Sequence, residues 1–383
     1  MKIAHVCPFS PPRVIGGVAR VVWELSKRQV KAGHNVSIIT SDFDKTKRIN
    51  IKKETVDGID IYYCYHYLKV GDFSTIWPSV YKKLLALKPD LIHCHIPGHL
   101  HSYLSKKAAK KLGIPYIVTT HCPWESNRSV PATVANWVSF NLFPTLRHAD
   151  AIIAITSWEH QFLLAEGVKQ ENIYTIPNGM DKMFFEKIIP NKFKEKHNIP
   201  INHKIILFFA RLNYTKNPLM FLDIAESILE KRGGITFCML GPDEGQLKFV
   251  EERINNFSDD IKKNFRLLPP DKNRKNIVEM YQSSDIYVLP SMREGNPLTL
   301  YEAYASGLPV IASNVNGVPD GLQDNVNGFL LERHDLKGFI EKVNFLLDNE
   351  DVRNEFIVNN LEKAKEYDWD IIERKTMDVY EKK

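Results

Sequence analysis

Two glutamates, Glu294 and Glu302, stand eight residues apart in the largely apolar segment MREGNPLTLYEAYASGLPVIAS. A carboxylate is costly to bury unless hydrogen bonds or a cation satisfy it. Either both side chains are solvated, or both hold something polar. For an arbitrary pair of glutamates the solvated interpretation is the commoner one, so this pair alone does not define a site.

The residues that separate the two glutamates predict the start of a helix. Asn296 suits an N-cap and Pro297 the first helical position, while Gly307 suits the C-cap. We therefore expect Glu294 just before the helix and Glu302 inside it, about one and a half turns along.

The N-terminus of that helix offers a second kind of contact. The amides of Leu298 and Thr299 would point out of the helix, where an anion or a hydroxyl can bind. Two carboxylates that accept hydrogen bonds from hydroxyls, beside amides that meet phosphate or sugar oxygens, suit a polyhydroxylated ligand.

A pair of basic residues occurs in the segment ILFFARLNYTKNPLMF. Arg211 directly follows an expected buried strand, and Lys216 comes five residues later, before a helix. Such a pair at the carboxyl end of a strand can bind phosphate, with arginine as the bidentate partner. The alternative is two surface charges on a loop.

The segment PFSPPRVIGGVARVV places Gly16 and Gly17 after the first expected strand, where a helix begins. Glycines at this position permit a close approach of the backbone to a ligand. The pattern is not GxGxxG, and no acidic residue ends the second strand to bind a ribose, which weakens the case for a dinucleotide-dependent oxidoreductase.

One histidine, His121 in VTTHCPW, follows a parallel strand at its carboxyl end. Functional residues of open α/β sheets gather at this edge. A lone histidine is nevertheless more often structural, so its position makes it a candidate only.

The segment DLIHCHIPGHLH contains five potential metal ligands, which are His93, Cys94, His95, His99 and His101. A zinc site is the sharpest competing hypothesis. Strand alternation, however, puts His93 and His95 on one face and Cys94 on the other, and the chain has neither an HExxH nor a CxxC pair. We therefore expect no metal site.

Short apolar runs alternate with longer amphipathic ones along the chain. The strand-like runs are Lys2–Val6, Asn35–Thr40, Ile59–Cys64, Asp90–His95, Pro115–Thr120, Ala151–Ile155, Tyr174–Ile176, Lys204–Phe209, Ile235–Leu240, Phe265–Leu268, Asp285–Leu289 and Pro309–Ala312. Between them lie helical patterns such as VARVVWELSKRQVKAG and LHSYLSKKAAKKLG, each ending in the glycine that a helix C-cap favours. This alternation predicts parallel sheets covered by helices on both faces.

Around Pro177–Pro200 the composition changes to a polar stretch interrupted by prolines, after which the alternation of strands and helices restarts. We expect two Rossmann-like, doubly wound domains that face a central cleft, where open α/β sheets place ligands. The expected domains are 1–188 and 189–367, with a closing helix over 368–383 that returns to the first.

The composition is that of an ordinary globular protein. Of 383 residues, 44% are hydrophobic and 25% are charged. The net charge of +5, from 51 Lys+Arg against 46 Asp+Glu, is too small to indicate a nucleic-acid partner. It would not repel an anionic substrate or an anionic membrane surface.

The sequence shows no targeting or membrane-spanning segment. The opening MKIAHVCPFSPP lacks the basic head and apolar run of a signal peptide, and no apolar run approaches about 18 residues. The five cysteines are an odd number without a CxxC pair, which indicates reduced thiols in a cytoplasmic protein.

Taken together, the motifs resemble one family over nearly the whole chain: retaining glycosyltransferases of the GT-B fold, specifically glycosyltransferase family 4. The matching segments, in family order, are GGVARVVWELSKRQVKAGHNVSIIT, DLIHCH, IPYIVTTH, YTIPNGMD, FFARLNYTKNP and MREGNPLTLYEAYASGLPVIAS. The last carries the family's E-x7-E pattern, whose ends here are Glu294 and Glu302. The closing YDWDIIERKTMDVYEKK resembles the family's final helix.

The resemblance implies a glycan-building enzyme with a nucleotide-sugar donor on the second domain and an acceptor on the first. It implies that Arg211 and Lys216 hold the donor diphosphate, so that no divalent metal or other cofactor is needed. It also implies that Glu294 contacts hydroxyls of the donor sugar and Glu302 those of the ribose.

The remaining implied donor contacts are a loop that reaches sugar and phosphate, a residue beside the transferred sugar and a loop that closes over phosphate and acceptor. The loop that reaches sugar and phosphate corresponds here to Asn296, Pro297, Leu298 and Thr299. The residue beside the transferred sugar corresponds to His121, and the closing loop to Gly16 and Gly17. The base would be met mostly by backbone near Leu268–Asp271.

Three departures from the family pattern bear on which sugar is carried. Ala210 precedes the arginine where glycine is frequent, and Cys122 follows His121 where aspartate is common. GNPLTL stands where GFGLPL or a similar segment is frequent. The class is unaffected by these differences.

The implied reaction is transfer of a hexose-type sugar to an acceptor hydroxyl of a glycan, a lipid-linked molecule or a small molecule, with retention of anomeric configuration. Two alternatives remain open: a nucleotide-sugar 2-epimerase of the same architecture, and a nucleotide-sugar-binding subunit that needs a partner.

The acceptor side carries one further hypothesis. NWVSFNLFPTLRH, if helical, would expose Trp137, Phe140 and Phe143 beside the basic helix KKAAKKLG. A buried helix face is the plainer interpretation. The alternative is peripheral association with the inner membrane face, next to a lipid-linked acceptor.

Overall fold

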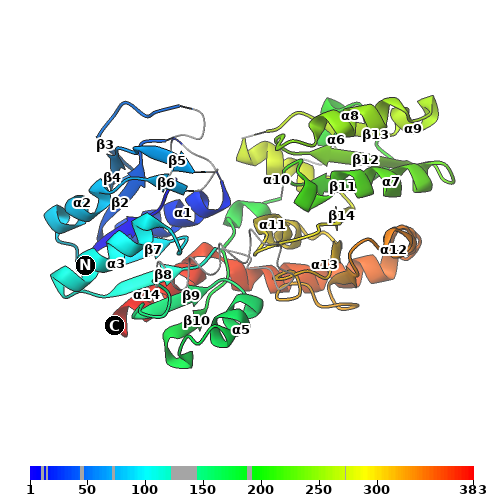
Figure 1. The fold of residues 1–383 in the computed structure, drawn as a ribbon. Helices are drawn as coiled ribbons and strands as arrows, with labels where there is room; N and C mark the ends of the chain where they lie inside the picture. Colours follow the sequence, from blue (N-terminus) through cyan, green and yellow to red (C-terminus); the bar gives the residue numbers. More distant parts are fainter. Residues whose placement is uncertain are drawn as a thin grey trace. The chain divides into compact units, whose positions relative to one another are not determined.

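The computed structural model describes residues 1–9, 13, 16–43, 47–70, 74–121, 145–187, 192–271 and 273–383. The chain divides into two compact units, Met1–Gly179 with Trp369–Lys383, and Met180–Asp368. Each unit is built on its own, largely parallel sheet (Figure 1), which confirms the α/β class with two Rossmann-like domains. The expected boundary after residue 188 lies inside the second unit.

The first unit contains an eight-stranded sheet in the order β10-β9-β8-β7-β1-β2-β4-β3. Its strands are β1 (Lys2–Val6), β2 (Asn35–Ser41), β3 (Lys53–Val56), β4 (Ile59–Cys64), β7 (Leu91–His95), β8 (Tyr116–Thr119), β9 (Ala151–Ala154) and β10 (Ile173–Thr175). All neighbours pair in parallel except β3, which runs antiparallel to β4 at the edge. Strands β5 (Leu68–Val70) and β6 (Ser74–Ile76) form a separate ribbon.

Helices cover both faces of this sheet. They are α1 (Gly17–Lys31), α2 (Ser79–Leu87), α3 (Leu100–Leu112), α5 (Ser157–Ala165) and α14 (Trp369–Glu381), with a short 3-10 turn η2 (Gln170–Asn172). On one face, α2 and α3 share a core with Ala4, Val6 and Ile39. On the other, α1 packs on Val36 and Ile38, and α14 packs beside α1. Alternate side chains of each strand therefore enter different cores.

The two helix ends that the glycines predicted are confirmed. The helix α1 stops at Lys31 and is followed by Gly33 with φ 88°, while α3 stops at Leu112 and is followed by Gly113 with φ 68°. Both glycines adopt the left-handed conformation that other residues resist.

The second unit contains six parallel strands in the order β13-β12-β11-β14-β15-β16. They are β11 (Lys204–Phe209), β12 (Ile235–Leu240), β13 (Phe265–Leu268), β14 (Ile286–Leu289), β15 (Val310–Ser313) and β16 (Gly328–Leu331). In chain order this is 3-2-1-4-5-6, the Rossmann arrangement, in which the direction of winding changes between β11 and β14.

The helices of the second unit share one extensive core with this sheet. They are α6 (Lys192–Lys196), α7 (Pro218–Leu229), α8 (Leu247–Asn255), α9 (Asp259–Lys263), α10 (Arg274–Gln282), α11 (Leu298–Ala305), α12 (Leu336–Asp348) and α13 (Glu350–Ala364), with 3-10 turns η3 (Lys182–Phe185), η4 (Tyr214–Lys216) and η5 (Lys365–Tyr367). Among the described residues, none of the helices is both long and apolar enough to span a bilayer.

Every strand expected from the sequence is present to within two residues, whereas four short strands were missed. The missed strands are β3, β5, β6 and β16. They span only three or four residues each, and KETV in β3 carries two charges, so neither periodicity nor apolar content distinguishes them from loops.

A close approach of two backbones follows β11 and β12. A Cβ added to Gly241 would lie 1.7 Å from the carbonyl oxygen of Ala210, whereas one added to Gly233 would meet nothing within 4 Å. Only glycine therefore fits at position 241.

We expect Gly241→Ala to lower the free energy of unfolding of the second unit by about 2–4 kcal/mol, because the backbone after β11 must move. Chemical denaturation measures this change. The matched variant Gly233→Ala should change stability by less than about 0.5 kcal/mol, and equal effects of the two variants would contradict the packing described.

Candidate functional site

The candidate residues of the second unit lie on loops at one edge of its sheet and on the helix α11 that follows one of these loops. The loops that follow β11, β12, β13 and β14 begin at Ala210, Gly241, Pro269 and Pro290, respectively. Because these strands are parallel neighbours, their carboxyl ends meet at the same edge. Side chains that are far apart in sequence are thereby brought together.

Glu294 is buried and its two oxygens have different partners. Nζ of Lys216 lies 2.5 Å from Oε2, and the hydroxyl of Ser291 donates to Oε1 over 2.7 Å. The carboxylate is only 3% exposed and the lysine 14%. The solvated interpretation of Glu294 is therefore wrong, and the loops after β11 and β14 are joined by an ion pair.

Glu302 is also buried, inside α11. Nη2 of Arg274 lies 3.0 Å from its Oε1 and 3.3 Å from Oδ2 of Asp181. The arginine is the first residue of α10, where the helix dipole disfavours a cation. The two carboxylates offset this unfavourable interaction. Sequence reasoning missed Arg274; the signal was a basic residue at the start of the helix after β13.

Arg211 is half-exposed and pairs with a residue that was also missed. Its Nη1 lies 2.6 Å from Oε2 of Glu244, which also accepts a hydrogen bond from Nδ2 of Asn213 over 3.0 Å. Oδ1 of Asn213 in turn accepts from the amide of Lys216. The acidic turn after β12 could have indicated Glu244, since it lies at the same sheet edge.

The start of α11 differs from the expectation by one position. The helix begins at Leu298, with Pro297 rather than Asn296 in the capping position. The side chain of Asn296 is buried instead and donates to the hydroxyl of Tyr301. Gly307, with φ 72°, lies just past the helix end as predicted.

The first amides of α11 are available to a ligand. The amide of Leu300 bonds to the carbonyl of Pro297, but no acceptor within the described part of the chain engages the amides of Leu298 or Thr299. They lie directly after the buried Glu294 loop. Amides at a helix start that carry the positive end of the dipole can bind an anion.

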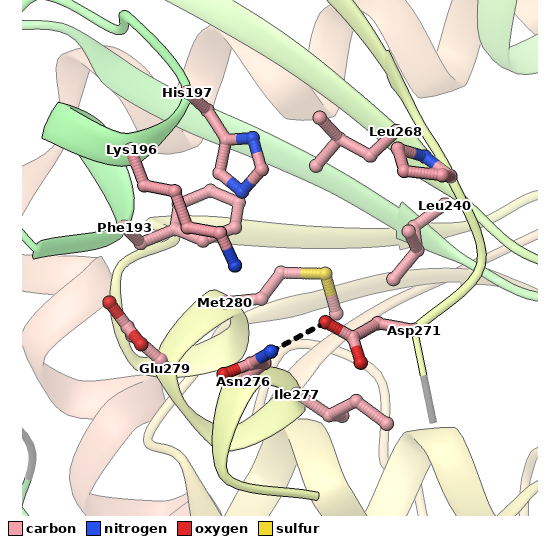
Figure 2. A pocket seen from close by; sticks show the side chains of 11 residues that line it. Phe193, Lys196, His197, Leu240, Leu268, Asp271, Asn276, Ile277, Glu279 and Met280 are labelled. Carbon is pink, nitrogen blue, oxygen red and sulfur yellow. Dashed lines mark hydrogen bonds between the residues drawn. The ribbon is translucent and has the colours of Figure 1, made fainter. Parts of the chain in front are cut away.

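A pocket opens beside the ends of β12 and β13 (Figure 2). Leu240 and Leu268 form one wall, and Met280 and Ile277 of α10 lie across from them. Most of the exposed lining of this pocket is apolar. Among its polar side chains, Nδ2 of Asn276 donates to Asp271 over 2.7 Å. The remaining lining residues are Phe193, Lys196, His197, Pro269 and Glu279.

The first unit holds the other candidates. Gly16 and Gly17 lie at the N-terminus of α1, and a Cβ on either would meet nothing within 4 Å. His121 follows β8 with φ 51°, a strained backbone conformation for a histidine. Cys122, Trp137, Phe140 and Phe143 lie outside the described residues.

His121 extends a cluster of buried histidines. Its Nε2 lies 3.0 Å from Nδ1 of His95, and Nε2 of His95 lies 3.1 Å from Nδ1 of His5. His93 contacts the hydroxyls of Tyr380 and Thr119 at 2.5 and 2.7 Å. His5, from β1, was the member that sequence reasoning missed.

The cluster bears on the metal hypothesis. His93 and His95 share a face while Cys94 enters the opposite core, as the alternation predicted. Ligand atoms of His5, His93 and His95 do lie within 4.8 Å of one another. Their ring nitrogens, however, already have hydrogen-bond partners in the protein, which accounts for the cluster without an ion.

Burial keeps these histidines neutral. Desolvation lowers the pKa of His5 to about 4 and the pKa values of His101 and His121 to about 3. It also lowers the pKa values of His93 and His95 well below the ordinary value of 6.5. Each ring at neutral pH therefore has one protonated and one unprotonated nitrogen.

Comparisons with known proteins identify the family of the chain. A model of the family "Glycosyl transferases group 1" matches residues 190–363, and one of "Glycosyltransferase Family 4" matches residues 15–183. The chain is 32% identical over 271 residues to the UDP-Gal:alpha-D-GlcNAc-diphosphoundecaprenol alpha-1,3-galactosyltransferase of Escherichia coli, covering 68% of this chain and 67% of that enzyme.

Two further comparisons cover the whole chain. An uncharacterized glycosyltransferase of Methanocaldococcus jannaschii is 26% identical over 405 residues, covering 99% of this chain and 98% of its own. The crystal structure of Anabaena HepE in complex with UDP superposes with a TM-score of 0.82 at 17% identity, over 100% of both chains.

The fold and these matches define a GT-B glycosyltransferase. Within that class, the chain belongs to the group 1, or family 4, glycosyltransferases, as its motifs indicated. It is therefore a transferase.

The buried histidines predict how stability depends on pH. Above about pH 7.5 they are neutral whether the chain is folded or unfolded. As the pH falls from about 6.5 towards 4, the unfolded chain binds protons that the folded one excludes, so stability falls by about 1.4 kcal/mol per pH unit for each such histidine.

We expect denaturation of the first unit between about pH 7.5 and 5 to show this decline. Replacing His101 by glutamine should reduce the slope of stability against pH by about 1.4 kcal/mol per pH unit, which is the contribution of one histidine. Stability that does not change over this range would contradict a neutral cluster.

Proposed function

We propose that this glycosyltransferase moves a hexose-type sugar from a nucleotide-diphosphate sugar to an acceptor hydroxyl, with retention and without a divalent metal. The observation that carries the proposal is the buried Lys216–Glu294 pair at the carboxyl edge of the second sheet. It presents a cation and a hydrogen-bond acceptor side by side, which suits a phosphate next to a polyhydroxylated ring.

The two cations at this edge have distinct tasks in the proposal. Arg211, half-exposed and paired with Glu244, exchanges that carboxylate for the donor diphosphate. Lys216 stays against Glu294 and faces the same phosphates. Because glycosyl transfer builds negative charge on the leaving phosphate, two fixed cations lower the barrier.

The two carboxylates hold the hydroxyls of the donor in this scheme. Glu294 accepts hydrogen bonds from hydroxyls of the transferred sugar. Lys216 and Ser291 fix the orientation of its oxygens for this contact. Glu302, oriented by Arg274, accepts from the ribose. The amides of Leu298 and Thr299 meet phosphate or sugar oxygens.

The pocket between β12, β13 and α10 receives the base. Its apolar walls suit the faces of a planar ring, and Asp271 and Asn276 offer polar atoms at its rim. Leu268 begins the segment that the sequence analysis expected to contact the base. Gly16, Gly17 and His121 enter the proposal through the family resemblance.

The names of similar proteins support the donor and acceptor classes. One relative is named for UDP-galactose and a diphosphoundecaprenol acceptor, and another for a diphospho-undecaprenol acceptor. The HepE structure has also been solved with UDP-glucose, with a TM-score of 0.80. We therefore propose a UDP-hexose and a lipid-linked acceptor as the first pair to assay.

The proposed chemistry is departure and attack on the same face of the sugar. The leaving phosphate, held by Arg211 and Lys216, takes the acceptor proton. Because the acceptor attacks the face that the phosphate leaves, the new bond keeps the configuration of the old one. Exclusion of water limits hydrolysis of the donor. A 2-epimerase would instead convert a nucleotide sugar without an acceptor, and a binding subunit would bind it without turnover.

We expect Arg211→Ala and Lys216→Ala each to lower turnover by about a hundredfold or more, because each removes a charge that stabilises the leaving phosphate. Transfer from a UDP-hexose measures the loss. Lys248, exposed on α8, provides the control, and Lys248→Ala should leave turnover unchanged. Near-normal turnover in both site variants would overturn the assignment.

Peripheral membrane association on the cytoplasmic side is the second part of the proposal. Lys106 and Lys110 of α3 and His148 line an open, polar hollow in the first unit. Burial and repulsion from Lys110 lower the pKa of Lys106, and repulsion from Lys106, together with burial and further nearby cations, lowers the pKa of His148. An anionic surface would relieve that repulsion.

We expect the protein to sediment with phosphatidylglycerol vesicles and not with phosphatidylcholine vesicles. Each lysine near an anionic surface contributes about 1 kcal/mol, so Lys106→Glu with Lys110→Glu should weaken binding at least roughly thirtyfold. Lys262→Glu with Lys263→Glu, on the second unit, is the matched control. Equal binding to both kinds of vesicle would remove this part of the proposal.

A further inference from the structure

A continuous line of hydrogen bonds runs from the core of the first unit to His121. Oε1 of Gln29, on α1, lies 2.8 Å from Nε2 of His5. Nδ1 of His5 lies 3.1 Å from Nε2 of His95, and Nδ1 of His95 lies 3.0 Å from Nε2 of His121. Gln29, His5 and His95 are fully buried, whereas His121 is only partly so.

Because the three imidazoles are neutral, each has a single proton to donate and a single lone pair to accept. In such a line all donors must point the same way, since a reversal would set two protons or two lone pairs against each other. The direction at one end therefore fixes the tautomer at the other.

The buried end fixes that direction through the amide of Gln29. Its Nε2 faces the sulfur of Met377 at 3.9 Å and the hydroxyl of Tyr380 at 3.5 Å. A thioether has no hydrogen to donate, so the amide nitrogen belongs on that side and the oxygen faces His5. The hydroxyl of Tyr380, for its part, can donate to Nδ1 of His93.

The consequence can be followed ring by ring. Oε1 of Gln29 requires a proton on Nε2 of His5, which leaves Nδ1 of His5 to accept from His95. His95 then accepts at Nδ1 from Nε2–H of His121. Nδ1 of His121 is left unprotonated, and no hydrogen bond to it is found within the described part of the chain.

We propose that Gln29, His5 and His95 are positioning residues that hold His121 in its Nε2–H tautomer, so that Nδ1 accepts a hydrogen bond from a hydroxyl of the transferred sugar. The inference rests on the proposed function for the identity of the ligand, but the tautomer itself does not depend on it.

This arrangement restricts which sugars the site accepts. An unprotonated nitrogen attracts a hydroxyl hydrogen and repels the oxygens of a carboxylate. The group of the sugar that His121 contacts must therefore have a hydrogen to donate, as a hydroxyl does, and a carboxylate is disfavoured at that position. Loss of one such neutral hydrogen bond reduces kcat/KM roughly threefold to tenfold.

The direct test is the tautomer of His121 in the intact protein. Long-range ¹H–¹⁵N correlation of histidine-labelled protein distinguishes the two nitrogens, and comparison with the His121→Asn variant assigns the ring. We expect a proton on Nε2 and none on Nδ1. A proton on Nδ1, or averaged nitrogen shifts from exchange between tautomers, would overturn the inference without affecting the proposed function.

The variant Gln29→Leu tests transmission along the line. It leaves a buried N–H of His5 without an acceptor, and moving one proton in each ring relieves that penalty. We therefore expect a larger Nδ1–H population at His121 and a threefold to tenfold loss of kcat/KM for UDP-hexoses.

Thr119→Val provides the control, because Thr119 bonds to His93 in the same core but lies off the line. The His121 tautomer should be unchanged in this variant. If the Nδ1–H population of His121 changes equally in Gln29→Leu and Thr119→Val, or changes in neither variant, Gln29 does not control the tautomer. If no nucleotide sugar is a substrate, the proposed function fails while the nitrogen shifts still decide the tautomer.

Discussion

The ion pair between Lys216 and Glu294 is the interaction on which the rest of the candidate site depends. A carboxylate that is 3% exposed needs a cation close by, and here the cation comes from the loop after a neighbouring strand. Because β11 and β14 are parallel and adjacent, both loops emerge at the same edge. The Rossmann strand order thus has a direct chemical consequence, since it joins residues that are 78 positions apart.

The first unit buries polar groups in a different way. Its histidines are held neutral by desolvation and satisfy one another, with Gln29, Thr119 and Tyr380 as terminal partners. Tyr380 belongs to α14, so the closing helix completes this network within its own unit. One unit therefore pairs buried or partly buried charges with one another, while the other fixes the donor and acceptor roles of neutral rings.

Much of this architecture could be predicted from the sequence, because buried parallel strands are written as continuous apolar runs and helix ends as glycines. The E-x7-E pattern and the basic pair identified both partners of the Lys216–Glu294 ion pair and one partner of each ion pair that Arg211 and Glu302 make. The partners Arg274, Glu244 and His5 were missed, since each reaches the site through strand order rather than sequence proximity. The start of α11 was misplaced by one residue because Asn296 suits both a cap and a buried amide.

The central claim is that Glu294 recognises the sugar and the neighbouring cations recognise the diphosphate. Isothermal titration of wild-type protein and the Glu294→Gln variant with a nucleoside diphosphate and with the corresponding nucleotide sugar separates these contributions. The account predicts that the variant keeps its affinity for the nucleoside diphosphate and loses most of the additional affinity conferred by the sugar. Equal losses for both ligands, or none for either, would contradict it.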